Sequence, residues 1–199
     1  APLEYSMNRN VNPRSITIRS RVALEPPFLE SGNSIHGALG RTLPPSLSPA
    51  NLGDSLEPSD ILSVTWARLH SQKDLIDFQP TVIIISDAPQ LVSDPNRFVK
   101  TVITIRETWP SALIWTPAIA GADTVALLSF LGIDIFDTSR LSIASQENSV
   151  IDTAGVRTEN SDSPNQIFDK SLDLLLVEFS TIRSAIREGR MRALVESRA

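Results

Sequence analysis

Residues 81–137 read TVIIISDAPQLVSDPNRFVKTVITIRETWPSALIWTPAIAGADTVALLSFLGIDIFD, and this stretch decides the fold. Three apolar runs in it, at 81–85, 113–115 and 133–136, are short and rich in β-branched or aromatic residues. Such runs are typical of strands that are buried on both faces, as in parallel sheets. We therefore expect three strands here.

Two helices are predicted between these strands. Ser93 or Asp94 is a suitable N-cap for the first, and Trp109-Pro110 ends its apolar periodicity. The second covers 124–131 and ends at Gly132, because glycine tolerates a positive φ. Strand–helix–strand–helix–strand at this spacing predicts crossover connections in a parallel sheet, and so an α/β fold.

The segments before these strands are less regular. Residues 15–23 alternate between apolar and polar, which predicts one half-exposed strand. Residues 25–58 are rich in proline and glycine and are expected to be mostly loop, with one short helix at 34–39. Residues 61–66 fit a strand or a helix, and 67–77 fit a connecting helix.

The remaining segment is predicted to contain a strand at 149–152, a turn at 153–155 and a polar surface loop at 158–165. Residues 166 to about 197 carry an apolar stripe at helical spacing. Gly189 interrupts this stripe and costs a helix about 1 kcal/mol relative to alanine. We expect either one long helix or a broken pair.

The composition excludes several kinds of site. The 199 residues contain no cysteine, so disulfides, thiolate catalysis and zinc ribbons are excluded. The two histidines, His36 and His70, have no ligand spacing, and we expect neither a metal nor another cofactor. Neither a long apolar run nor a secretory signal is found, which predicts a cytoplasmic protein without a membrane span.

The net charge of −5 does not favour binding to nucleic acid by bulk electrostatics. The final segment is nevertheless basic, with five arginines against Glu188 and Glu196; these are Arg183, Arg187, Arg190, Arg192 and Arg198. Such a segment is either a local contact for tRNA or a partner, or a solvated helix face.

Three blocks of residues resemble the tRNA-guanine transglycosylase superfamily. Residues 115–137 are similar to a late-barrel segment that ends in a G-[VI]-D-[ML]-F-D strand, here Gly132 to Asp137. Residues 86–99 are similar to the D-A-x-x-L and D-P-x-x-F-V patterns of archaeosine synthase. Residues 182–197 resemble its V-R-x-A-I-R-x-G-R-L-R-E-L-V-E helix. The chain thus looks like the N-terminal domain of archaeosine synthase.

This resemblance implies a reduced or complete (β/α)-barrel over residues 1–165 and a C-terminal helical extension over 166–199. It also implies a role in archaeal tRNA modification. Transglycosylases exchange a guanine in tRNA through an aspartate in the G-x-D-x-F-D strand, and archaeosine synthase adds lysine to 7-cyano-7-deazaguanine in tRNA. The implied partners are tRNA and a second polypeptide that carries a catalytic lysine motif, a zinc site and an RNA-binding module.

The chain departs from these families at the residues that carry chemistry. The S-D-S-G-G-F-Q loop that binds the base is missing, and Ala118 and Ala120 replace loop glycines. The lysine motif has no counterpart, since the only lysines are Lys73, Lys100 and Lys170. These departures favour a domain or subunit that scaffolds the catalytic part or contacts tRNA.

Three residues are the candidates for a site. Asp137 follows a buried strand, where barrel enzymes place chemistry, and is either a nucleophile or a structural carboxylate that caps the next element or pairs with Arg140. Asp87 ends another strand and is either a ligand-binding group or a turn former. Arg140 fits a phosphate or carboxylate, although pairing with Asp137 or Asp134 is the simpler expectation.

Three functions remain open. The first is a non-autonomous part of an archaeosine synthase. The second is a complete, minimal transglycosylase that uses Asp137 and Asp87. The third is an interaction module without chemistry.

Overall fold

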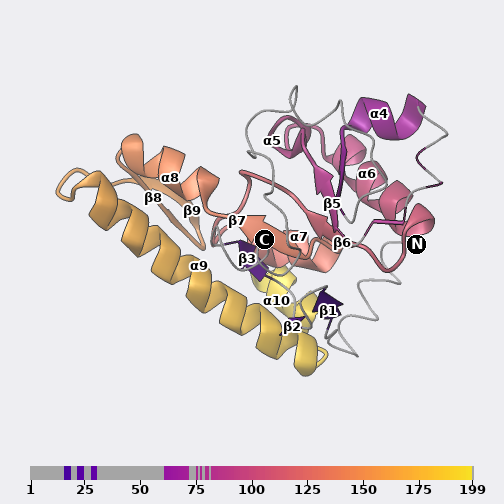
Figure 1. The fold of residues 1–199 in the computed structure, drawn as a ribbon. Helices are drawn as coiled ribbons and strands as arrows, with labels where there is room; N and C mark the ends of the chain where they lie inside the picture. The colour runs from indigo at the N-terminus through magenta and orange to yellow at the C-terminus, as the bar shows by residue number, and fades with distance from the viewer. Residues whose placement is uncertain are drawn as a thin grey trace.

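The computed structural model describes residues 16–18, 22–24, 28–30, 61–71, 75, 77, 79–80 and 82–198. Its central feature is a sheet of five parallel strands in the order β3-β7-β6-β5-β4 (Figure 1). The strands are β3 (Phe28–Glu30), β4 (Ile61–Val64), β5 (Val82–Ile85), β6 (Leu113–Trp115) and β7 (Ile135–Asp137). The predicted α/β fold with a parallel sheet is confirmed.

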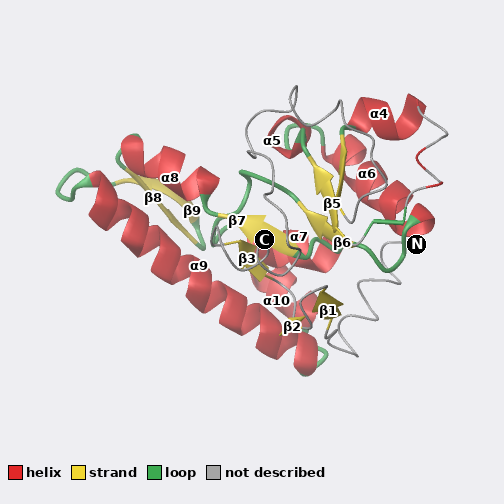
Figure 2. Ribbon diagram, in the orientation of Figure 1, coloured by secondary structure: helices red, strands yellow, loops and turns green. Residues whose placement is uncertain are grey.

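Seven helices are described, and Figure 2 distinguishes them from the strands. They are α4 (Trp66–Ser71), α5 (Ala88–Leu91), α6 (Pro95–Thr108), α7 (Val125–Leu131), α8 (Ser139–Gln146), α9 (Pro164–Arg187) and α10 (Met191–Arg198). The two helices predicted between the strands are confirmed as α6 and α7. In α6 the Asp94 side chain accepts a hydrogen bond from the Arg97 amide, as expected of an N-cap.

Two small antiparallel pairs complete the described strands. One joins β1 (Ile16–Ile18) to β2 (Val22–Leu24), and the other joins β8 (Ser149–Asp152) to β9 (Gly155–Thr158). The prediction of one strand over 15–23 is therefore wrong, because the alternating residues are divided between two strands that pair with each other. The turn predicted at 153–155 is present at 153–154, and Gly155, with a φ of 123°, is the first residue of β9.

Other boundaries differ from the predictions. The third strand begins at Ile135 rather than at residue 133. The helix expected over 67–77 is described as α4, from Trp66 to Ser71, and most of 72–77 lies outside the described residues. The strand β3 lies inside the segment expected to be mostly loop, and the short helix expected at 34–39 lies outside the described residues. In the segment 61–66, which fitted a strand or a helix, residues 61–64 form the strand β4 and Trp66 begins α4.

One face of the sheet packs against helices. The side chains of Ile83, Ile114 and Phe136 belong to a buried cluster with residues of α6, α7 and α9. The rings of Phe136 and Phe179 in α9 lie 5.7 Å apart between centroids. Residues whose side chains point to the other face of the sheet, such as Ile84 and Ile135, are also buried. The strands are thus buried on both faces, as their β-branched sequences predict.

The C-terminal segment is a broken pair of helices rather than one long helix. A capping box between Ser163 and Gln166 begins α9, two residues before the predicted start. Gly189 adopts a φ of 67° after the last turn. The Arg190 amide donates to the Ala185 carbonyl and the Gly189 amide to the Ile186 carbonyl, which is a Schellman motif. A left-handed glycine at this position turns the chain into α10.

Candidate functional site at the carboxyl edge of the sheet

The carboxyl ends of parallel strands share one edge of a sheet, which is where α/β proteins place their sites. Asp137 is the last residue of β7, Asp87 follows β5 by two residues, and Arg140 lies in the first turn of α8. The strand β6 lies between β5 and β7. The three candidate residues therefore come from neighbouring segments of this edge.

Asp137 is held by three N–H donors. Its carboxylate accepts hydrogen bonds from the Trp115 indole at 3.2 Å, the Ala118 amide at 3.2 Å and the Ser139 amide at 2.9 Å. The residue is only 7% exposed. It thus connects the end of β7 to β6, to the loop after β6 and to the start of α8. This is the arrangement of a structural carboxylate that caps the next element.

Ala118 contributes strain to this arrangement. Its φ is +58°, in the left-handed region that residues with a side chain disfavour by about 1–2 kcal/mol. The hydrogen bond from the Ala118 amide to the Asp137 carboxylate holds the loop in this conformation.

We expect Ala118→Gly to raise the free energy of unfolding by about 1 kcal/mol, because glycine adopts this φ without a steric cost. Chemical denaturation measures the change. Ala154→Gly, at an exposed turn position without a positive φ, is the control and is expected to have no stabilising effect. Destabilisation by Ala118→Gly would contradict the assignment of strain.

Arg140 pairs with Asp123, not with Asp137 or Asp134 as expected. Its guanidinium contacts the two Asp123 oxygens at 2.7 and 2.8 Å in a bidentate ion pair. Gly121 leaves room for this pair, since a Cβ there would lie 2.5 Å from Arg140 Nη1 and from Asp123 Oδ1. The expectation was wrong because the loop between β6 and α7 brings a carboxylate, Asp123, to α8.

Asp134 belongs to a different, fully buried ion pair. Its carboxylate lies 2.6 Å from Arg106 of α6 and accepts the Ile114 amide at 3.0 Å. Arg106 also donates to the carbonyls of Ala112 and Gly132. This cluster lies at the amino ends of β6 and β7, at the edge of the sheet opposite to the candidate site.

Asp87 also makes a structural contact. Its Oδ2 accepts a hydrogen bond from the Trp66 amide at 3.0 Å and so satisfies a donor at the start of α4. Its Oδ1 is buried and has no hydrogen-bond partner among the residues that the structure describes. Asp87 is therefore more than a turn former, since it joins the end of β5 to the neighbouring β4–α4 connection.

Two cavities open near this edge. One, of about 300 Å³, is lined by Ala118, Ile119 and Arg140 among others. The second, of about 390 Å³, is apolar and shares Ile119 with the first. Neither Asp87 nor Asp137 lines either cavity. Of the three candidates, only Arg140 is in a position to contact a small ligand there.

The described histidine and acidic residues do not form a metal site. Among residues 61–71 and 82–198, no group of three histidine, aspartate or glutamate side chains could hold a metal ion. His70 Nδ1 lies 2.8 Å from the Trp66 carbonyl, and the two rings lie 3.7 Å apart. His36 lies outside the described residues.

The predicted arginine cluster lies at the end of α9, in the turn after it and in α10. Arg190 pairs with Glu188, and Arg192 with Glu196 at 2.9 Å. Arg183 lies over the Phe179 ring. Arg198 makes a bidentate pair with the buried Glu178, and this hydrogen-bonded contact raises the pKa of Arg198. Arg187 lies in the last turn of α9.

The sequence did not single out Trp115, Asp123, Gly121 or Arg106 as partners in these contacts. The one available signal was Arg106 itself, a charged residue on the apolar side of a predicted helix.

Within the described part of the chain, no helix has the length and apolar character needed to cross a membrane. No family model matches the chain, and no curated protein matches it.

Proposed function

We propose that this chain is a barrel-type domain or subunit of a tRNA-modifying transferase in archaeosine biosynthesis. In this role it scaffolds the catalytic part and contacts tRNA or the partner polypeptide, and the chemistry resides in that partner. The proposal begins from the resemblance of residues 115–137, 86–99 and 182–197 to the transglycosylase superfamily.

The order of the strands supports a barrel. The strands β4, β5, β6 and β7 lie side by side in the same order as in the chain. In a doubly wound sheet, by contrast, the spatial order of the strands changes direction at one point in the sheet. The strand β3, which precedes them in the chain, pairs with β7, the last of them. In a (β/α)-barrel the first strand pairs with both the last and the second. Within the described residues β3 pairs with β7 but not with β4. Helices pack on the face that would be the outside of such a barrel.

The hydrogen bonds and burial of Asp137 are the main support for a scaffold role. A nucleophilic carboxylate must reach the substrate, but both oxygens of Asp137 are engaged by N–H donors and the residue is 7% exposed. It also lines neither of the two cavities near it. This favours the structural role over that of a transglycosylase nucleophile.

Incubation of the chain with tRNA and labelled guanine tests the proposal. We expect no incorporation of label at protein concentrations comparable to that of the tRNA. We also expect the chain to co-purify with a polypeptide that carries cysteines and a lysine motif, and lysine addition to the modified base to require both. Label incorporation that Asp137→Asn abolishes would refute the scaffold role and favour an autonomous transglycosylase.

A further inference from the structure

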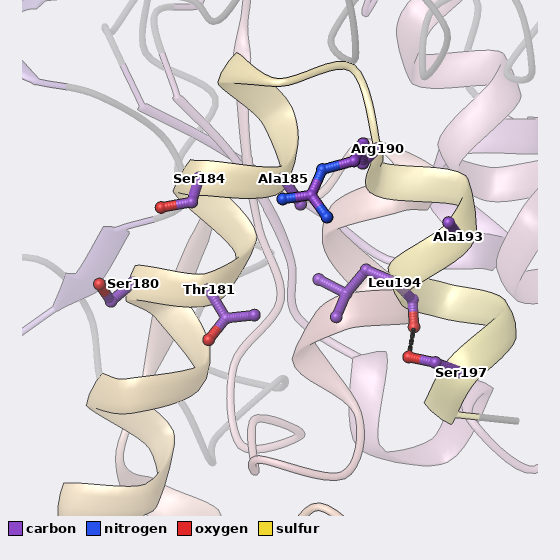
Figure 3. A pocket seen from close by; sticks show the side chains of 8 residues that line it. All are labelled: Ser180, Thr181, Ser184, Ala185, Arg190, Ala193, Leu194 and Ser197. Atoms are coloured by element: carbon purple, nitrogen blue, oxygen red, sulfur yellow. Dashed lines mark hydrogen bonds between the residues drawn. The ribbon is translucent and has the colours of Figure 1, made fainter.

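A groove of about 450 Å³ lies between the end of α9 and α10, away from the carboxyl edge of the sheet (Figure 3). Ser180, Thr181 and Ser184 line it from α9, and Ser197 lines it from α10. Arg190 lies in the turn that joins α9 to α10. Figure 3 shows its side chain directed across the gap.

The Schellman motif at Gly189 holds Arg190 in this position. The Arg190 amide donates to the Ala185 carbonyl at 2.8 Å, so the backbone that carries the guanidinium is tied to α9. At the other end of α10, Arg198 pairs with Glu178, which is 2% exposed. Because both ends of α10 are held to α9, the two walls of the groove keep their spacing.

The lining has the donors that bind phosphate oxygens. A guanidinium offers a planar fork of N–H groups, and hydroxyl groups are common partners of backbone phosphates. Among the described residues that line the groove, none carries a side-chain carboxylate. The Thr181 and Ser197 hydroxyls donate to carbonyls of their own helices. For Ser180 and Ser184, no side-chain hydrogen bond is formed within the described residues, so their hydroxyls remain for a ligand.

The local charge also suits a polyanion. Five arginines lie in residues 183–198 of a chain whose net charge is −5. They face three glutamates, since Glu188 and Glu196 lie in the same segment and Glu178 pairs with Arg198. The Arg190–Glu188 pair joins side chains that are 68% and 49% exposed. Exposed pairs of this kind are weak, so a phosphate that binds in the groove readily replaces Glu188 as the partner of Arg190.

We propose that the groove between α9 and α10 binds backbone phosphates of RNA, with Arg190 as the charged contact and Ser184 as a hydroxyl donor. The choice of RNA among polyanions rests on the proposed function. The groove itself is independent of any chemistry at Asp137.

Fluorescence anisotropy of the full chain with a short labelled single-stranded RNA tests the site. Arg190→Ala is expected to weaken binding about fivefold and to reduce the slope of log K against log salt concentration by about 0.7. Ser184→Ala is expected to weaken it about twofold. The matched control is Arg157→Ala in β9, where an arginine that is 60% exposed pairs with Asp152 outside the groove. This control should change binding less than twofold.

Equal losses from Arg190→Ala and Arg157→Ala would overturn the groove but leave the proposed function intact. Absence of binding of the single-stranded RNA by the wild-type chain at low salt would overturn the groove as a site for RNA phosphates, but not the proposed function, which co-purification with the partner and the lysine-addition assay test separately. Competition by inorganic phosphate as effective as that by RNA would indicate a free-phosphate site instead. Binding to phosphatidylserine vesicles, without binding to RNA, would likewise overturn the proposal.

Discussion

Asp134→Ala is expected to lower the free energy of unfolding by about 3–5 kcal/mol, the largest effect of any single substitution considered. Asp134 is fully buried and pairs with Arg106, whose side chain is 5% exposed. Removal of Asp134 leaves the buried charge of Arg106 without its counter-charge, and breaking a buried pair in this way typically lowers the free energy of unfolding by about 3–5 kcal/mol. The Ile114 amide also loses an acceptor.

Urea or guanidinium denaturation measures this change. The matched control is Glu196→Ala, which breaks the exposed pair with Arg192 and should cost less than about 0.5 kcal/mol. The double variant Arg106→Met/Asp134→Leu should lose less than the sum of its two single variants, because the two charges are coupled. A loss for Asp134→Ala no greater than that for Glu196→Ala would show that the pair does not hold the amino ends of β6 and β7.

Asp137→Ala is expected to lower the free energy of unfolding by about 3 kcal/mol. The substitution leaves three N–H donors at the carboxyl edge without their acceptor, and each hydrogen bond to a charged group contributes about 1.5–3 kcal/mol before relaxation. Part of this loss is recovered because the strained Ala118 can then relax.

The direction of this effect separates two roles of Asp137. Catalytic residues often lie in sites that are not optimised for stability, so their removal is commonly neutral or stabilising. A structural carboxylate is destabilising when removed. Asp137→Asn retains one acceptor oxygen and is expected to lose about half as much as Asp137→Ala. An increase in stability with Asp137→Ala would contradict the structural role and favour the role of Asp137 as a nucleophile.

The sequence predicted the elements whose causes are local. The β-branched run at 81–85 became β5 and the apolar run at 113–115 became β6. Asp94 caps α6 through the Arg97 amide three residues away. Gly132 has the positive φ that its place at a helix end predicted. These features depend on interactions within about one helical turn or one strand, and a linear pattern contains that information.

Boundaries between weakly patterned elements were predicted less well. The alternation over 15–23 fits one strand or two equally, since period two is the same in both. Only pairing between Ile16 and Leu24 distinguishes them. The strand β3 follows two prolines, and its place depends on pairing with β7, more than one hundred residues later. Neither pairing leaves a signal in the local sequence.

What the sequence by itself determined was therefore the α/β class, the order of the main elements and the three candidate residues at their ends. Only the tertiary structure decided the partners of those residues. Arg140 meets Asp123 from 17 positions away, Asp137 meets Trp115 from 22, and Asp134 meets Arg106 from 28. The physical reason is that a buried carboxylate takes whichever donors the packing of strands and helices brings to it, and this packing is a property of the whole chain.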